Sequence, residues 1–157
     1  MIMPSRLLLV DDDEIVREAL EISLARLDRI KTVGSVASGE EAILAADRLR
    51  PDLIVLDLGL PGLSGMDTMR CIVKSLPKVR IVVLSATQSP EQIQQAFDTG
   101  AAGYVFKQSA AIDLLEAIRA VIAGRQYASP VIRRNVDSAD AARIQLPGAP
   151  FASANAS

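Results

Sequence analysis

The segment at residues 53–57 reads Leu-Ile-Val-Leu-Asp, four consecutive branched aliphatic residues followed by an acid. Because no polar residue alternates with the apolar ones, this segment is expected to form a strand buried on both faces. Residues 7–10 (Leu-Leu-Leu-Val) and 81–84 (Ile-Val-Val-Leu) repeat the pattern, and residues 31–36 and 103–106 are weaker strand candidates. Strands of this kind are typical of a parallel sheet that helices cover on both sides.

Segments with helical periodicity lie between these strands. Val16, Leu20 and Leu24 recur on one helical face. Ser38 opens a capping-box pattern, and Ser89 precedes a first-turn proline. Five strands that alternate with five helices require parallel pairing and right-handed crossovers. The sequence therefore predicts an α/β fold in the form of a three-layer sandwich.

The composition narrows the possible functions. Of 157 residues, 50% are hydrophobic and 23% are charged, which is typical of a globular chain. The 17 basic and 19 acidic residues give a net charge of -2, so no general attraction to nucleic acid or to an anionic membrane is expected. The chain has no histidine and one cysteine, Cys71, which excludes Ser-His-Asp triads, histidine-containing zinc sites and an internal disulfide. No segment resembles a signal peptide or a membrane span, and we expect a cytoplasmic protein.

Polar residues stand at the carboxyl ends of the predicted strands, where reactive groups gather in an open parallel sheet. Residues 11–13 are three aspartates after the first strand, Asp57 ends the third, Ser85 ends the fourth and Lys107 follows the fifth. Acids brought together repel one another unless a cation lies between them, and Mg2+ prefers carboxylate, carbonyl and water oxygens. A lysine and a hydroxyl beside such a site would bind a tetrahedral anion, which completes the parts of a phosphoryl-transfer site. Each residue alone has a simpler interpretation, and Asp13 by itself is expected to cap a helix. Because all of them occur together, in the order of the strands, a phosphoryl-transfer site is favoured over these separate interpretations.

Three segments resemble the response-regulator receiver domain, the CheY-like family. They are residues 7–13 (Leu-Leu-Leu-Val-Asp-Asp-Asp), 51–62 (Pro-Asp-Leu-Ile-Val-Leu-Asp-Leu-Gly-Leu-Pro-Gly) and 103–107 (Gly-Tyr-Val-Phe-Lys). The resemblance covers roughly residues 5 to 127. It implies a flavodoxin-like (βα)5 sandwich whose five-stranded parallel sheet has the order 2-1-3-4-5.

The resemblance implies a role for each matching acid. Asp57 would be the phosphoacceptor, receiving a phosphoryl group from a sensor histidine kinase. Mg2+ would be bound by Asp12 directly, by Asp11 mainly through water, by Asp57 and by the backbone carbonyl of Gly59. A bare glycine at position 59 departs from the larger side chain usual in the family. We interpret it as either leaving the acyl phosphate more open to water or removing a group that would position that water, with a sign that the sequence does not give.

The resemblance also implies a phosphate-binding and switch set. Lys107 would pair with the acyl phosphate, Ser85 would bind one of its oxygens, and Ala86 belongs to the same set. Ser85 would move toward the phosphoryl group, and Tyr104 would fill the space that it leaves. The expected result is a shift in an output surface, with a phosphorylation-dependent homodimer as the expected partner state.

The region after Lys107 resembles the NarL/FixJ branch, whose members carry a LuxR-type helix-turn-helix domain. Gln108-Ser109 stands where most receivers have a proline, and Tyr-Ala-Ser-Pro follows at residues 127–130. We predict a receiver domain at residues 1–128 and, at 129–157, helical turns followed by an Ala/Ser/Pro-rich linker or tail without a second domain. The favoured interpretation is the N-terminal part of a DNA-binding transcriptional regulator, and a stand-alone receiver is the alternative. This chain itself is not expected to contact DNA or a membrane.

Two other functions are alternatives to a signalling receiver. A magnesium-dependent phosphatase would share the metal and the nucleophilic aspartate, but the Asp-x-Asp arrangement of aspartate-nucleophile hydrolases does not follow the first strand. A phosphorylation-independent pseudo-receiver typically lacks an acid, the phosphoacceptor or the lysine, and all of these are present here. We therefore expect that the chain is not an enzyme. The only reactions that we expect it to catalyse are its own phosphorylation and dephosphorylation.

Overall fold

The computed structural model describes residues 3–136, with the side chains of residues 135 and 136 excepted. Internal contacts group the chain into two compact units, Met1–Ile81 and Val82–Ser157. The division falls within one strand, so each unit is a small α/β assembly.

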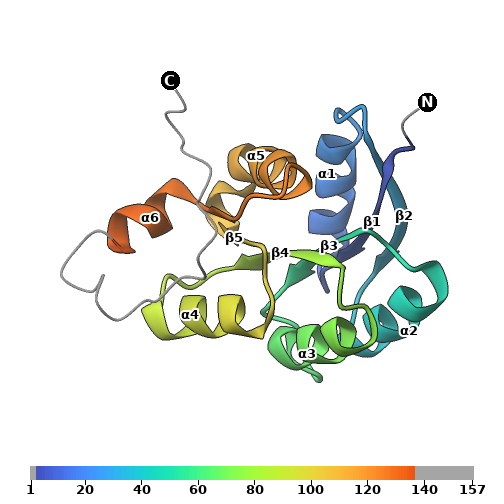
Figure 1. Ribbon diagram of the computed structural model, residues 1–157, viewed down its shortest axis with the longest axis horizontal. Helices are drawn as coiled ribbons and strands as arrows, with labels where there is room; N and C mark the ends of the chain where they lie inside the picture. The colour runs from blue at the N-terminus through green and yellow to red at the C-terminus, as the bar shows by residue number, and fades with distance from the viewer. Residues whose placement is uncertain (1–2, 137–157) are drawn as a thin grey trace. The chain divides into compact units, whose positions relative to one another are not determined.

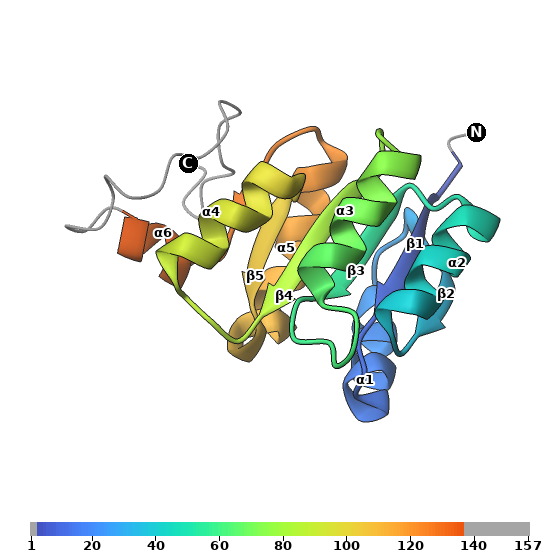
Figure 2. The ribbon, with the colours of Figure 1, turned by 90° about the horizontal axis from the view of Figure 1, so that it is seen from below.

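The first unit contains three parallel strands in the order β2-β1-β3. Its elements are β1 (Ser5–Val10), α1 (Glu14–Leu24), β2 (Ile30–Val36), α2 (Gly39–Leu49), β3 (Leu53–Asp57), α3 (Gly65–Ser75) and the first residues of β4 (Arg80–Ser85). Helix α1 covers one face of these strands, and α2 and α3 cover the other (Figure 1). Seen from that second side, α2 and α3 lie in front of the strands (Figure 2).

The core of the first unit consists of the apolar runs that predict its strands. The side chains of residues 7–10 have 0% exposure, and those of residues 53–57 are all buried. The register places Val10 opposite Leu56, so β1 and β3 end side by side. Burial on both faces is the physical reason that these strands lack polar alternation.

The second unit contains the end of β4 and two further parallel strands, in the order β4-β5-β6. Its other elements are α4 (Pro90–Thr99), β5 (Gly103–Phe106), the 3-10 helix η1 (Lys107–Ser109), α5 (Ala110–Ile122), β6 (Tyr127–Ala128) and α6 (Pro130–Val136). Helices α4 and α5 lie on opposite faces of β4 and β5 (Figures 1 and 2).

The predicted strand order is present within each unit, as 2-1-3 in the first and 4-5 in the second. Strand β4 begins in the first unit, where the Arg80 N–H donates to the Asp52 carbonyl at 3.1 Å. The short strand β6 was not expected. The Tyr127 N–H donates to the Ala102 carbonyl at 3.0 Å, and the Ser129 N–H donates to the Tyr104 carbonyl at 2.9 Å. This pairing covers the edge of β5, whose backbone groups would otherwise lack strand partners.

The predicted helix signals function as local caps. The Ser38 hydroxyl accepts from the Glu41 N–H at 3.1 Å and donates to the Glu41 carboxylate at 3.0 Å. The Ser89 hydroxyl accepts from the Gln92 N–H at 3.4 Å, with Pro90 in the first turn of α4. Helix α4 ends at Gly100, whose φ of 133° favours glycine. These signals set where α2 begins and where α4 begins and ends.

Helix α6 occupies the segment for which helical turns are predicted after the receiver region. The Ser129 carbonyl accepts from the Ile132 and Arg133 N–H groups at 2.9 and 3.1 Å, which opens this helix. The Ala/Ser/Pro-rich tail predicted beyond it lies outside the described residues. Within residues 3–136, the helices are all too short or too polar to cross a membrane.

Candidate functional site

Three aspartates form an acid cluster in the first unit. Asp11 and Asp12 follow β1 and Asp57 ends β3, and the register of Val10 opposite Leu56 brings these residues to one edge of the sheet. One carboxylate oxygen from each aspartate lies within 4.8 Å of the others. Asp11 and Asp57 are buried, with 0% and 2% exposure, whereas Asp12 is exposed. The structure therefore assembles all three acids that the sequence predicts.

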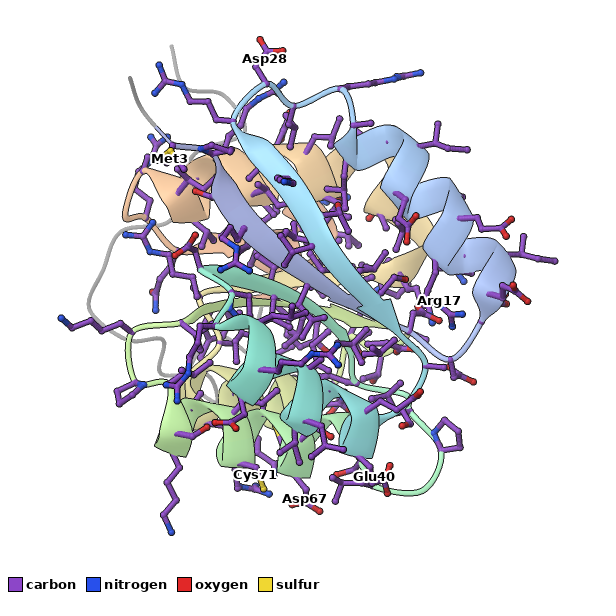
Figure 3. The ribbon with its side chains drawn as sticks, turned by 90° about the vertical axis from the view of Figure 1, so that its right-hand side faces the viewer. Met3, Arg17, Asp28, Glu40, Asp67 and Cys71 are labelled. Atoms are coloured by element: carbon purple, nitrogen blue, oxygen red, sulfur yellow. The ribbon has the colours of Figure 1, made fainter. Side chains whose placement is uncertain are left out.

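Backbone and side-chain hydrogen bonds hold the Asp11 side of the cluster. The Asp13 N–H donates to Asp11 Oδ1 at 2.9 Å, and Arg17 Nη1 donates to the Asp11 carbonyl at 2.6 Å. Arg17 projects from the first turns of α1 (Figure 3). Its guanidinium thus holds the Asp11 backbone in place from the side of α1.

Asp13 has the structural role expected of it alone. Its Oδ1 accepts from the N–H groups of Ile15 and Val16 at 2.9 and 3.3 Å. These bonds make it the N-cap of α1, since they satisfy two backbone donors at the start of that helix. Its carboxylate is therefore directed to the helix rather than to the acid cluster.

The Asp57 carboxylate is oriented by the loop that follows it. The Gly59 N–H donates to Asp57 Oδ1 at 2.8 Å. A Cβ atom added to Gly59 would lie 3.3 Å from the same oxygen. Gly59 therefore holds the carboxylate through its backbone while leaving one side of it without a side chain.

The donor set of the acid cluster fits Mg2+. Its three carboxylates are oxygen donors, the kind that this hard cation prefers, and the backbone of Gly59 is bonded to one of them through its N–H. Two buried anions at this separation repel each other, and a divalent cation relieves that repulsion. The exposure of Asp12 leaves one side open to water, which suits a partly hydrated ion.

The phosphate-binding set predicted from the sequence lies in the second unit. Strands β4 and β5 pair with Ser85 opposite Phe106, so Ser85 and Lys107 come to one edge of these two strands. The Ser85 Oγ accepts from the Thr87 N–H at 3.2 Å and from Gln92 Nε2 at 3.0 Å. Ser85 is buried, Lys107 is half-buried and Ala86 is exposed.

Tyr104 has its ring inside the second unit, with 0% exposure. Its hydroxyl donates to the Thr87 carbonyl at 2.9 Å. Burial raises the pKa of Tyr104, and a side-chain hydrogen bond with Ser85 partly offsets that rise. The two residues predicted to form a switch are thus in contact, with Thr87 bonded to both.

The sequence did not indicate a role for three residues that bond to the predicted site residues: Arg17, Thr87 and Gln92. A signal for Arg17 did exist, because a cation in the first turns of a helix opposes the helix dipole and needs a compensating partner. Thr87 and Gln92 gave no such signal, since a loop threonine and a helix glutamine are ordinary surface residues. Their contacts depend on how α4 packs.

Comparison with known proteins identifies the class of this chain. Residues 7–119 match the model of the response regulator receiver domain. Response regulator GacA of Pseudomonas viridiflava is 34% identical over 131 residues, which cover 83% of this chain and 61% of GacA. Response regulator protein VraR of Staphylococcus epidermidis is 33% identical over 130 residues, which cover 83% of this chain and 62% of VraR. The crystal structure of a two-component response regulator of the LuxR family from Aurantimonas sp. SI85-9A1 has a TM-score of 0.79 and 36% identity, and the match covers 83% of this chain and 94% of that one.

The chain belongs to the response regulator receiver domain family. It is a receiver domain of two-component response regulators of the LuxR type, and its fold is the flavodoxin-like receiver fold. The family and the fold expected from the sequence are thereby confirmed. The chain spans 61% and 62% of the length of the two curated relatives named above.

Proposed function

We propose that Asp57 accepts a phosphoryl group and that the acid cluster binds the Mg2+ needed for the transfer. The observation that carries this proposal is the buried Asp57 carboxylate with oxygens of Asp11 and Asp12 within 4.8 Å. Two of the three carboxylates are buried, and acids brought this close repel one another unless a cation lies between them. The geometry suits a nucleophile that is used together with a cation.

The chemical step is a displacement at phosphorus. One Asp57 carboxylate oxygen forms a bond to the phosphorus of a phosphohistidine in a sensor histidine kinase, and the bond from phosphorus to the imidazole nitrogen breaks. The electron pair of that bond stays on the leaving nitrogen, and Asp57 becomes an acyl phosphate. The Gly59 N–H fixes the orientation of the attacking carboxylate through Oδ1.

Mg2+ would be held by Asp12 directly, by Asp11 mainly through water, by Asp57 and by the Gly59 carbonyl. When bound, it supplies positive charge against the phosphoryl oxygens. Arg17 keeps the Asp11 backbone in place from the side of α1. We assign Lys107, Ser85 and the Ala86 segment to binding of the transferred phosphoryl group, because a cation and a hydroxyl suit a tetrahedral anion.

The proposed output is a change at Ser85 and Tyr104. A phosphoryl group brings about -1.5 to -2 charge and new acceptor oxygens. The Ser85 hydroxyl would bind one of these oxygens and would then exchange its bonds with Thr87 and Gln92. Tyr104 shares Thr87 with Ser85, so its packing would respond to that exchange.

We propose that the domain acts in the cytoplasm as part of a longer transcriptional regulator. The names of GacA and VraR and the LuxR-family solved structure support a response regulator of this type. A sensor histidine kinase would be its phosphoryl donor, and a phosphorylation-dependent homodimer its active state. DNA would be bound by a helix-turn-helix domain outside this chain. Catalysis would be limited to the domain's own phosphorylation and dephosphorylation.

The test is the intact mass of the protein after incubation with acetyl phosphate and Mg2+. We expect one phosphoryl adduct that disappears with a chelator and in Asp57→Asn. Asp28→Asn is the matched control, because Asp28 is exposed beyond the far end of α1 (Figure 3) and should keep the adduct. A folded wild type without an adduct would favour a pseudo-receiver that binds partners without phosphate. An adduct that persists in Asp57→Asn would assign the phosphoacceptor elsewhere.

A further inference from the structure

Gly65 is the first residue of α3, and it lies against the backbone of the loop that carries Asp57. A Cβ atom at this position would lie 2.5 Å from the Leu58 Cα and 2.6 Å from the Asp57 carbonyl oxygen. Both distances are shorter than any ordinary contact of a Cβ atom. The obstructing atoms belong to the main chain, so no side-chain rotation could relieve the overlap.

We propose that Gly65 is a positioning residue for the phosphoacceptor. Its lack of a side chain lets the first turn of α3 rest directly on the peptide that joins Asp57 to Leu58. This contact would fix the Asp57 carboxylate and the Gly59 carbonyl relative to Asp11 and Asp12. The inference rests on the proposed function and adds to it a residue that touches neither the metal nor the phosphoryl group.

The loop transmits its position to the reactive atoms because it is short and internally bonded. Only Leu58 separates Asp57 from Gly59, and the Gly59 N–H closes this turn onto Asp57 Oδ1 at 2.8 Å. A displacement of the Asp57–Leu58 peptide therefore moves the carboxylate and the Gly59 backbone together. Small displacements matter here, since a misplacement of about 1 Å can reduce a reaction rate about a hundredfold.

On the other side of the contact, the first turn of α3 is closed by its own hydrogen bonds. The Ser64 hydroxyl accepts from the Asp67 N–H at 3.1 Å, which caps α3. The Thr68 hydroxyl donates to the Ser64 carbonyl at 2.7 Å, and Thr68 has 0% exposure. Because these bonds keep the first turn of α3 in its shape, an added methyl group at Gly65 would press on the Asp57–Leu58 peptide rather than unwind the turn.

Gly39 supplies a matched control within the same unit. It is buried and is the first residue of α2, as Gly65 is the first residue of α3. A Cβ atom there would overlap the Thr68 hydroxyl and would lie 3.1 Å from the Leu63 carbonyl. The overlap is chiefly with the Thr68 hydroxyl, which bonds to the Ser64 carbonyl, so Gly39→Ala disturbs the first turn of α3. It places no atom against Asp57 or Leu58, and it therefore separates disturbance of the turn from pressure on the phosphoacceptor loop.

The experiment compares Gly65→Ala with Gly39→Ala in the full 157-residue chain. Three quantities are measured: the thermal midpoint, the increase of that midpoint with added Mg2+, and the rate of acyl phosphate formation from acetyl phosphate. We expect both variants to have lower midpoints. We further expect Gly65→Ala to phosphorylate at least about tenfold more slowly than Gly39→Ala and to lose most of the Mg2+-induced shift.

Each outcome separates the inference from the proposed function. Equal phosphorylation rates and equal Mg2+ shifts in the two variants, with an active wild type, would overturn the role of Gly65 alone. An inactive wild type would overturn the proposed function and the inference with it. If Gly65→Ala is unfolded, both variants are compared at low temperature with an osmolyte that favours compact states. Failure to fold there, while Gly39→Ala folds, would mean that Gly65 serves the fold and would reject the positioning role.

Discussion

The Ser129 hydroxyl oxygen accepts a hydrogen bond from the Phe106 backbone N–H, with the two atoms 2.9 Å apart. Ser129 has 0% exposure, and its own N–H donates to the Tyr104 carbonyl at 2.9 Å. Its carbonyl in turn accepts from the Ile132 N–H in the first turn of α6. One small residue therefore links the strand that carries Tyr104 to the helix that follows the receiver region.

Replacing Ser129 by alanine should lower the free energy of unfolding by about 1–3 kcal/mol. The variant leaves the Phe106 N–H facing a methyl group at a fully buried position, and an unsatisfied donor has a penalty of this size. Urea unfolding measures the change. The control is Ser75→Ala at the exposed end of α3, for which a change within about 0.5 kcal/mol is expected. Equal stabilities of the two variants would show that water satisfies Phe106.

Hydrogen exchange would show whether this loss is local. Since Ser129 joins α6 to β5, Ser129→Ala should increase exchange in α6 more than in α2 or α3. A uniform increase over all helices would mean that α6 unfolds only with the whole domain.

The chain should lose stability as the pH rises above about 10, because both of its tyrosines have raised pKa values in the folded state. Burial is the main cause for Tyr104 and for Tyr127; the charges of Asp113 and Glu116 also contribute at Tyr127. A raised pKa means that the folded state keeps a proton that the unfolded chain releases. The contribution is thus complete below the ordinary tyrosine value of 10.0 and is lost as the pH climbs toward the folded value.

Each tyrosine can steepen this loss by up to about 1.4 kcal/mol per pH unit. The measurement is urea unfolding between pH 9 and about pH 11, alongside an ultraviolet titration of tyrosinate. Since the chain has 2 tyrosines, the Tyr104→Phe, Tyr127→Phe double variant removes both contributions and serves as the control. An equal slope in the double variant would assign the loss to lysines instead.

A side chain at position 59 should slow the hydrolysis of the acyl phosphate. The Gly59 Cβ position lies 3.3 Å from Asp57 Oδ1, so a larger residue there would place its side chain beside the carboxylate that carries the phosphoryl group. We expect Gly59→Leu to lose the phosphoryl group roughly threefold to tenfold more slowly than wild type, by excluding water. Gly59→Asn separates exclusion of water from positioning of water, since its amide could hold a water molecule. Faster hydrolysis in both variants would reverse the sign of the effect, and equal rates in all three proteins would dismiss the role of Gly59.

The sequence predicted those features that leave a local pattern, and it missed those that depend on packing. The buried strands at residues 7–10 and 53–57 were recognisable because burial on both faces removes polar alternation. Strand β6 was not, because two residues cannot show a period. Gly59 and Gly65 illustrate the same limit at the site. Both are glycines after the same strand, but only the folded backbone shows that one faces a carboxylate oxygen and the other faces a peptide.

Mg2+ should stabilise the folded chain, and Asp12 should be needed for that effect. A cation that binds only the folded state at ten times its dissociation constant adds about 1.4 kcal/mol to the free energy of unfolding. Asp12→Asn removes one carboxylate from the acid cluster and should abolish most of this gain, whereas Asp28→Asn should keep it. Without Mg2+ the effect of Asp12→Asn on the free energy of unfolding should reverse, because the substitution relieves repulsion among the acids. The variant should then be at least as stable as wild type. Thermal unfolding of wild type and both variants, each with Mg2+ and with a chelator, measures these differences. A cluster that does not bind the cation would show no Mg2+-dependent difference between the two variants.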